Sequence, residues 1–128
     1  MDYTETIYAI WRKADHNKFI ERFYQNFFKN YPQYERMFCC DMERQQTKVL
    51  QTLNFIFNSL DHMDQLQECF DYVKEVHEKF NLSKEDYQNF NNNLILSLKE
   101  SLPDEEPMSS KEEEAWREVL KLITEKIS

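Results

Sequence analysis

Glycine is missing from this sequence of 128 residues, which also contains only three prolines. Hairpin turns and phosphate-binding loops depend on glycine, because glycine adopts positive φ angles without steric cost. The composition therefore disfavours a β-rich fold, a P-loop and a glycine-rich nucleotide site. An all-helical domain is the remaining expectation, and the chain is long enough to build one around a single hydrophobic core.

The sequence also lacks a basic excess and a long apolar run. With 24 acidic and 16 basic residues, its formal net charge is −8, which disfavours nucleic acid as a partner. The apolar runs are too short to span a membrane, and the acidic N-terminus has no apolar core of a signal peptide. We therefore expect a cytoplasmic protein with neither a nucleic-acid nor a membrane partner.

Cysteine is scarce and its spacing suggests no framework. The three cysteines are Cys39, Cys40 and Cys69, and an odd number in this arrangement predicts reduced thiols. A disulfide between the neighbours Cys39 and Cys40 is strained, so free thiols are expected there. Two adjacent cysteines without clustered histidines do not indicate a zinc site.

Aromatic residues, by contrast, are abundant: ten Phe, seven Tyr and two Trp. Helical periodicity predicts helices over residues 2–13, 17–31, 42–60, 63–79, 84–101 and 110–127. Pro32 ends the second helix, and Asn81 can end the fourth with a left-handed residue. Capping boxes are expected at the starts of the last two helices. They pair Ser83 with Asp86 and Ser110 with Glu113.

His77 lies at the end of an apolar helical stripe. The stripe consists of Leu66, Phe70 and Val73. An imidazole on such a face is either a core histidine with a polar partner or a ligand. Tyr24 stands among phenylalanines on another helix, and Gln46 is the one polar residue of a third apolar face, unless it faces solvent near its helix start. Three polar groups directed into one apolar interior favour a cofactor pocket.

Four segments resemble one family, the bacterial single-domain haemoglobins related to the flavohaemoglobin globin domain. FYQNFFKNYPQYERMF (23–38) resembles their second and third helices, and QTKVL (46–50) is similar to their distal QPKAL-type motif. HEKFNLSKEDY (77–87) resembles the proximal histidine, its turn and the tyrosine ten residues on, and Trp116 falls where the last helix carries AW. The resemblance implies a globin-like fold of six to seven helices, a 3-on-3 sandwich around haem, with residues 1–128 as a single globin domain.

The resemblance also implies a role for particular residues. His77 would be the axial ligand of the iron of haem b, iron protoporphyrin IX. The other haem-binding residues would be Phe38, Leu50, Leu82, Tyr87 and Phe90. The distal, gas-binding side would be formed by Tyr24, Gln46 and Phe28. Because the connector before the distal helix is short, Gln45 is the alternative to Gln46.

The implied function is reversible binding of dioxygen and other diatomic gases for storage, transport or scavenging. The phenol of Tyr24 and the amide of Gln46 would donate hydrogen bonds to a partly negative gas ligand, worth roughly 1–3 kcal/mol. A gas-binding protein is favoured over an enzyme, and nitric-oxide dioxygenase activity is expected only with a separate reductase. The alternative is a gas-sensing or haem-free signalling module. Both a monomer and a homodimer are compatible with the sequence.

Among the departures from the family pattern, one concerns the last helix. Family members carry a glutamate late in a longer last helix, where it bonds the proximal tyrosine and histidine. Glu125 comes too early to take that position. A weaker electronic push on the iron is the expected consequence, which disfavours peroxidase-like chemistry and strong nitric-oxide dioxygenase activity.

Overall fold

Helices account for most of the chain that the structure describes. The computed structural model describes residues 3–38 and 41–128, and the all-α prediction is confirmed, since no strand occurs in these ranges. The helices are α1 (Thr4–Lys13), α2 (His16–Asn30), η1 (Pro32–Met37), α3 (Met42–Asn58), η2 (Leu60–Leu66), α4 (Gln67–Glu78), α5 (Lys84–Glu100) and α6 (Ser110–Ile127), where η marks a 3-10 helix. Cys39 and Cys40, with their expected free thiols, lie outside the described residues.

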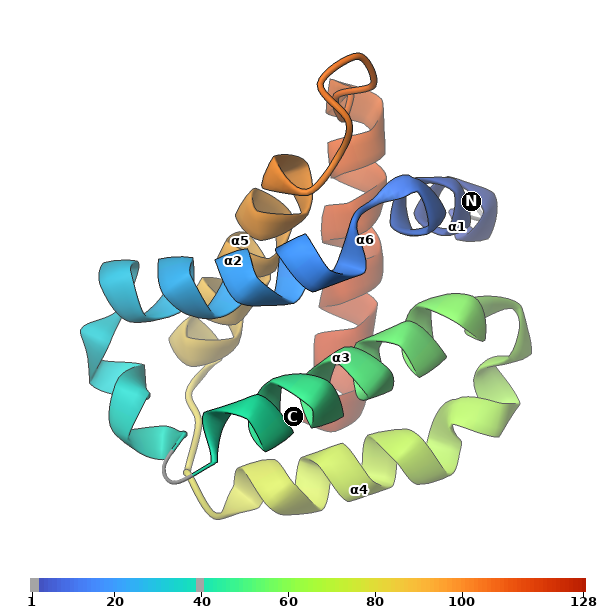
Figure 1. Cartoon of the computed structure of the whole chain (residues 1–128). Helices are drawn as coiled ribbons and strands as arrows, with labels where there is room; N and C mark the ends of the chain where they lie inside the picture. Colours follow the sequence, from blue (N-terminus) through green and yellow to red (C-terminus); the bar gives the residue numbers. More distant parts are fainter. Residues whose placement is uncertain (1–2, 39–40) are drawn as a thin grey trace.

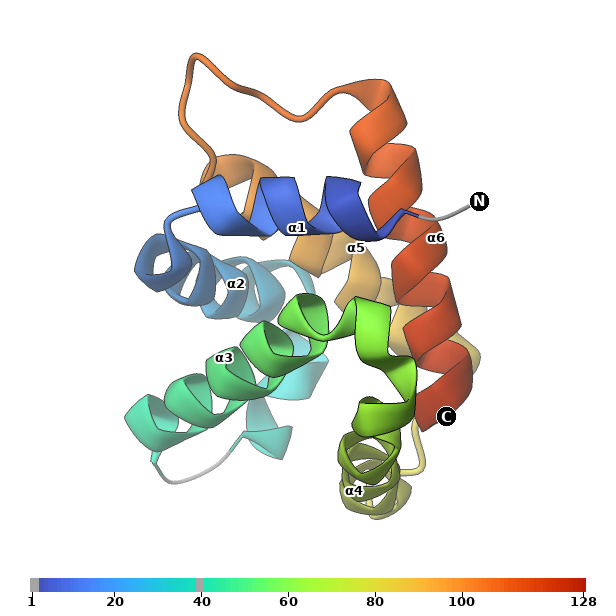
Figure 2. The ribbon, with the colours of Figure 1, turned by 90° about the vertical axis from the view of Figure 1, so that its right-hand side faces the viewer.

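The helices pack in two groups around one hydrophobic core: α2 with α5, and α6 with α1 and α4. Helix α2 packs across α5, while α6 contacts α1, α4 and α5. The chain enters η2 from α3 and returns through α4, and both helices lie below α2 (Figure 1). The side view shows α3 and α4 diverging from η2, with α6 at the edge of the molecule (Figure 2).

Aromatic side chains join the two groups in the core. Trp11 of α1 meets Phe19 of α2 and Phe57 of α3 edge to face, with ring centroids 5.2 and 5.0 Å apart. Phe57 also meets Trp116 of α6 at 4.8 Å. All four rings are buried, and burying each phenylalanine contributes about 1.5–3 kcal/mol. Part of the large number of aromatic residues therefore serves to pack the core.

The helix boundaries differ from the predicted ones between α3 and α4. Helix α3 ends at Asn58 and not at residue 60, and α4 begins at Gln67 and not at residue 63. Residues 60–66 form η2 instead, because His62 has non-helical angles, φ −130° and ψ 57°. The two apolar stripes are thus joined by a kinked corner.

Side-chain caps fix the starts of the later helices. The capping box of Ser83 with Asp86 is confirmed: each side chain bonds the backbone of the other residue. The last capping box lies one residue earlier than predicted, because Ser109 pairs with Glu112. Asn81 adopts the expected left-handed conformation, with φ 52°, which asparagine tolerates better than most residues. This turn brings the start of α5 beside the end of α4.

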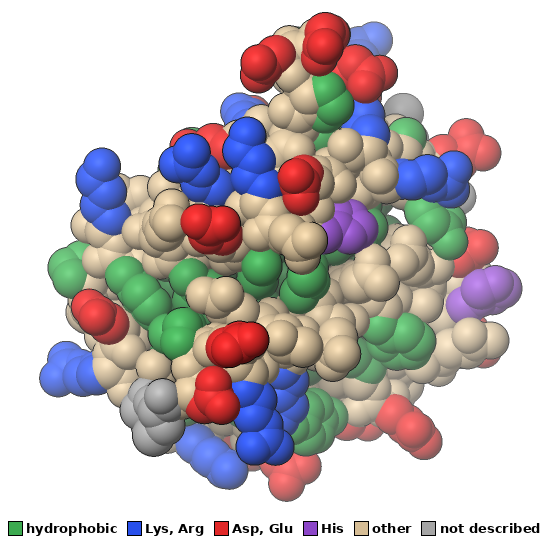
Figure 3. Space-filling view, viewed as in Figure 1, with side chains coloured by type: hydrophobic (Ala, Val, Ile, Leu, Met, Phe, Trp, Pro, Cys, Tyr) green, Lys and Arg blue, Asp and Glu red, His purple; other side chains and the backbone are tan. Residues whose placement is uncertain are grey.

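Acidic side chains gather on the loop between α5 and α6 and on the first turn of α6. They project at the tip of the molecule in Figure 3. The residues are Asp104, Glu105, Glu106, Glu112, Glu113 and Glu114. Among the described residues, no helix has the length and apolar character needed to cross a bilayer.

Candidate functional site

An apolar cavity of about 320 Å³ lies among α2, α3, α4, α5 and α6. This volume is within the range of small-molecule and cofactor sites. Six of the sequence-predicted site residues line it. They are Tyr24, Phe38, His77, Leu82, Tyr87 and Phe90. These residues come from segments far apart in the sequence, so the fold brings together most of the site that the sequence suggested.

His77 lies on α4, near its end, and is half-buried. Its Nδ1 atom is 3.5 Å from the hydroxyl oxygen of Tyr87, which comes from the first turn of α5. Burial lowers the pKa of His77 below its ordinary value of 6.5, so the imidazole is neutral at pH 7. A neutral imidazole with one nitrogen engaged by a neighbour is the form in which histidine binds metals.

Tyr24 faces the same cavity from α2 and is only 3% exposed. Its hydroxyl group has no hydrogen-bond partner among the described residues. Burial raises the pKa of Tyr24, and the side chain of Gln45 partly offsets that shift, although the two groups do not meet hydrogen-bond geometry. An unsatisfied buried donor costs about 1–3 kcal/mol, so a ligand with an acceptor atom would relieve this cost.

Phe38 forms an aromatic wall beside Tyr24. The two rings meet edge to face, 5.5 Å apart at 86°. Phe38 also contacts Phe27 at 6.2 Å, and Phe27 meets Phe90 of α5 at 6.1 Å. This cluster is T-shaped at each of these contacts, an arrangement that aromatic rings favour. It fixes the wall from which the phenol of Tyr24 projects.

Three predicted site residues do not line the cavity: Gln46, Leu50 and Phe28. Gln45 and Val49 line it instead, which corrects the register of α3 by one residue. Helix α3 begins at Met42 as predicted, with Asp41 as its cap, and its cavity face carries Gln45, Val49, Thr52, Leu53 and Ile56. Gln46 and Leu50 are turned away by about 100° around the axis. Phe28 packs behind the wall, 5.7 Å from both Tyr24 and Phe38.

Sequence reasoning missed several polar lining residues. Lys48 of α3 lines the cavity, and its Nζ lies 5.7 Å from the ring centroid of Tyr72 on α4. Its spacing of three residues from Gln45 is the signal that could have identified it. Asp86 also lines the cavity, although the sequence indicated only a helix cap. Tyr34 of η1 joins it through a hydrogen bond of 2.5 Å, and no local pattern predicts that contact.

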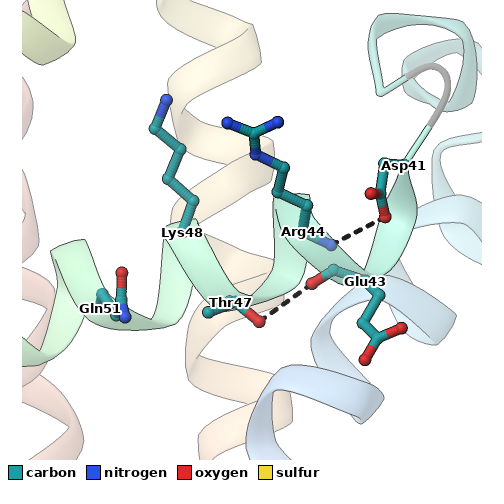
Figure 4. A pocket seen from close by; sticks show the side chains of 6 residues that line it. All are labelled: Asp41, Glu43, Arg44, Thr47, Lys48 and Gln51. Atoms are coloured by element: carbon teal, nitrogen blue, oxygen red, sulfur yellow. Dashed lines mark hydrogen bonds between the residues drawn. The ribbon is translucent and has the colours of Figure 1, made fainter.

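A second, open hollow of about 500 Å³ lies on the outer surface of α3. Its residues are Asp41, Glu43, Arg44, Thr47, Lys48 and Gln51. Arg44 and Lys48 project on one side of the helix and Glu43 on the other (Figure 4). The backbone N–H of Arg44 donates to Asp41, and the hydroxyl of Thr47 donates to the Glu43 carbonyl. These contacts belong to the helix itself, so the hollow is a solvated helix surface.

The cavity is better suited to a cofactor that carries its own metal than to a bare metal ion. Among the described residues, no group of three or more His, Cys, Asp or Glu side chains could hold a metal ion. A haem iron takes most of its ligands from the porphyrin and needs one axial side chain, which in globins is a histidine. His77 and the apolar walls fit this requirement.

The helical fold and its histidine-bearing apolar cavity are those of a helical cofactor-binding protein. The family model described as Globin matches residues 21–127, and the chain belongs to the globin family. Globins generally bind haem, so a haem-binding kind of function follows from membership. A comparison with curated proteins finds no match.

Proposed function

We propose that this globin binds haem b in the cavity between α3 and α4, with His77 as the axial ligand, and that it binds diatomic gases reversibly. When bound, haem would supply an iron that, in its reduced form, can bind dioxygen or a related gas. One observation carries the proposal. The imidazole of His77 and the unpartnered hydroxyl of Tyr24 line the same apolar cavity.

Tyr87 supports the role of His77 by selecting the nitrogen that carries the proton. If Nδ1–H donates to the phenol oxygen of Tyr87, the lone pair of Nε2 remains free for a metal. The partner of Nδ1 in the described structure is a neutral phenol, which raises the basicity of His77 less than a carboxylate would. This arrangement favours gas binding over peroxidase-like chemistry.

Tyr24 and Gln45 are the residues that we assign to the gas ligand. Tyr24 has a hydroxyl proton that no described residue accepts, and the Gln45 amide lines the cavity beside it. In a cavity with mainly apolar walls, hydrogen bonds from these groups to a partly negative ligand would slow its release. The apolar side chains of Val49 and Leu53 line the same wall and would help to exclude water.

Lys48 supplies a cation for the acidic edge of the porphyrin. It lines the cavity and also reaches the outer surface of α3 (Figure 4). Haem b has two carboxylate groups on one edge, and a lysine ammonium at the cavity mouth can pair with either of them. If haem occupies the cavity, Lys48 would be the residue that pairs with one of its carboxylate groups.

Two further properties belong to the same proposal. Any turnover, such as nitric oxide oxidation, would draw its electrons from a separate reductase. We assign the protein to the cytoplasm because three cysteines without framework spacing are typical of a reducing compartment. Monomer and homodimer are both retained.

The test is hemin binding by wild type and by two histidine variants. We expect His77→Ala to lose stoichiometric binding or its axial-ligand spectrum, because it removes the proposed iron ligand. His62→Ala is the matched control, since His62 is an exposed histidine of η2, and it should bind hemin as wild type does. An unchanged absorption spectrum in His77→Ala, before and after dithionite and carbon monoxide, would overturn the assignment. Failure of wild type to bind hemin would favour the haem-free alternative.

A further inference from the structure

Tyr34 is a buried tyrosine whose hydroxyl group makes two hydrogen bonds at the cavity. It is 4% exposed and lines the cavity from η1. Its hydroxyl donates to Oδ1 of Asp86 at 2.5 Å and accepts from Nδ2 of Asn89 at 3.1 Å. Both partners lie on α5, more than fifty residues away in sequence. This network therefore ties η1 to the start of α5.

The α5 end of this network is held in place independently. Oδ2 of Asp86 accepts from the backbone N–H of Ser83 at 2.8 Å, and the Asp86 N–H donates to the Ser83 hydroxyl at 3.2 Å. One carboxylate oxygen thus belongs to the helix cap and the other to Tyr34. Because the cap fixes Asp86, the carboxylate is a rigid anchor for Tyr34.

The other end of the network leads to the gas-binding side of the cavity. The Tyr34 ring stacks on Phe27, with centroids 4.8 Å apart and planes at 13°. Phe27 contacts Phe38, and Phe38 packs edge to face on Tyr24. Phe38 also directly follows η1, the segment that Tyr34 anchors. A shift of η1 would therefore move the aromatic wall against which the phenol of Tyr24 rests.

We propose that Tyr34 is a positioning residue for the gas ligand: its bond to Asp86 holds Phe38, and through Phe38 the phenol of Tyr24, at the cavity wall. The inference rests on the proposed function, because it concerns the same cavity. Tyr34 does not itself donate to the ligand, since its hydroxyl proton is given to Asp86. Its effect is on the geometry, and hence the lifetime, of the hydrogen bond that Tyr24 makes.

The first experiment compares haem-loaded wild type with Tyr34→Phe, which removes only the hydroxyl. We expect unchanged haem stoichiometry and dioxygen dissociation faster by roughly three- to tenfold, since partial loss of one hydrogen bond changes a rate by about that factor. The infrared carbonyl stretch of the carbon monoxide complex should broaden and move to higher frequency, because it reports the donor at the ligand. Tyr31→Phe is the matched control, a neighbouring tyrosine whose ring packs on the same Phe27, and it should change neither quantity.

A double-mutant cycle separates positioning from general stabilisation. In a Tyr24→Phe background, Tyr34→Phe should give no further increase in dissociation rate, because the group that it positions is gone. An unchanged rate and carbonyl stretch in Tyr34→Phe overturn the inference, and so do rate effects of the two substitutions that simply multiply. If wild type fails to bind hemin, both the proposed function and the positioning role are overturned. If wild type binds hemin but Tyr34→Phe gives either of these results, only the positioning role is overturned.

A second pair of variants keeps the test decisive if Tyr34→Phe does not fold. Asp86→Asn weakens the bond to Tyr34, and Ser83→Ala weakens the helix cap while leaving the bond of Tyr34 to Asp86. The inference expects faster dioxygen dissociation in Asp86→Asn than in Ser83→Ala. Equal rates in the two variants would assign the effect to the cap and contradict a role for Tyr34.

Discussion

At the scale of the residue, Tyr24 carries a cost in the protein without ligand. Its buried hydroxyl has no partner among the described residues, and most buried polar groups in proteins are bonded. Such a group is typical of a position kept for binding and not for stability. Removing this hydroxyl should therefore stabilise the folded protein without ligand and weaken its retention of the ligand.

Tyr24→Phe tests the effects on stability and on ligand release directly. We expect the haem-free variant to be more stable than wild type by about 1 kcal/mol, because the unsatisfied hydroxyl is removed. We expect the haem-loaded variant to release dioxygen about tenfold faster, because the donor is lost. Urea denaturation and stopped-flow spectroscopy measure the two effects. Unchanged dissociation would assign Tyr24 to the core, and Tyr31→Phe serves as the control for loss of a phenol hydroxyl.

Asp86 gives a prediction on pH dependence. The hydrogen bond from Tyr34, followed by that from the Ser83 backbone, lowers the pKa of Asp86 below 3.8. A carboxyl with a depressed folded pKa contributes stability that is present above the unfolded pKa and is lost as pH falls through the folded pKa. The unfolding free energy of wild type should therefore exceed that of Asp86→Asn above pH 3.8, and the difference should shrink below it. Chemical denaturation from pH 6 to about 2.5 measures this.

The control for that series is Asp104→Asn, in the exposed loop before α6. It should leave the shape of the pH profile unchanged, since the Asp104 side chain has no hydrogen bond or ion pair in the described structure. A difference between wild type and Asp86→Asn that stays constant down to the lowest pH would show that the charge of Asp86 contributes nothing to folding.

At the scale of the element, the turn between α4 and α5 sets where His77 and Tyr87 meet. Asn81 has φ 52° in this turn, a region that costs most residues about 1–2 kcal/mol and costs glycine nothing. In a chain without glycine, asparagine takes that place. The turn is short, so a change in its geometry would move α5 relative to α4.

Two substitutions at this position test the role of the turn. Asn81→Gly should be close to neutral in unfolding free energy, and Asn81→Ala should cost about 1 kcal/mol, because alanine resists the left-handed region. Urea denaturation of the haem-free protein measures both. If Asn81→Ala is neutral and Asn81→Gly destabilising, the left-handed conformation is not what the turn requires.

Lys48 of α3 and Tyr72 of α4 both line the cavity, with the Lys48 ammonium 5.7 Å from the ring centroid of Tyr72. If Lys48 pairs with the porphyrin carboxylates, Lys48→Met should speed hemin loss by roughly tenfold or less, as expected for a partly exposed ion pair. Hemin dimethyl ester, which has no free carboxylate, should dissociate from wild type and Lys48→Met at the same rate. Transfer of hemin to an acceptor globin measures these rates.

The matched control is Lys74→Met, an exposed lysine of α4 that does not line the cavity. It should leave the rates for both ligands unchanged. A Lys48→Met effect that is equally large with the dimethyl ester would mean that Lys48 contributes through its aliphatic chain and not through its charge.

At the scale of the whole molecule, the sequence predicted the features that depend on local pattern. The helical periodicity, the break at Pro32 and the left-handed Asn81 were all readable because each depends on a few neighbouring residues. The family resemblance placed Tyr24 and His77, and the structure brings both to one cavity. Local patterns thus predicted the helices and their breaks, and the resemblance predicted two residues of the cavity.

Features set by distance or by rotation were not predictable in the same way. Gln45 and Gln46 lie about 100° apart around the axis of α3, and the start of the helix at Met42, which was predicted correctly, does not decide which of them faces the cavity. The bond between Tyr34 and Asp86 joins residues far apart in sequence, and Asp86 already had a sufficient role as a cap. Periodicity gives the approximate apolar face of a helix, but neither its exact rotation nor the partner of a side chain.

The resonance Raman spectrum of the reduced, haem-loaded protein tests the central claim most directly. The account predicts an iron–imidazole stretching band in wild type that is lost in His77→Ala and kept in His62→Ala. The band should lie at the low-frequency end of the range for globins, because the partner of Nδ1 among the described residues is the phenol of Tyr87, which is a weaker acceptor than a carboxylate. A wild-type spectrum without this band, or a band that survives in His77→Ala, would contradict the assignment of His77 to the iron.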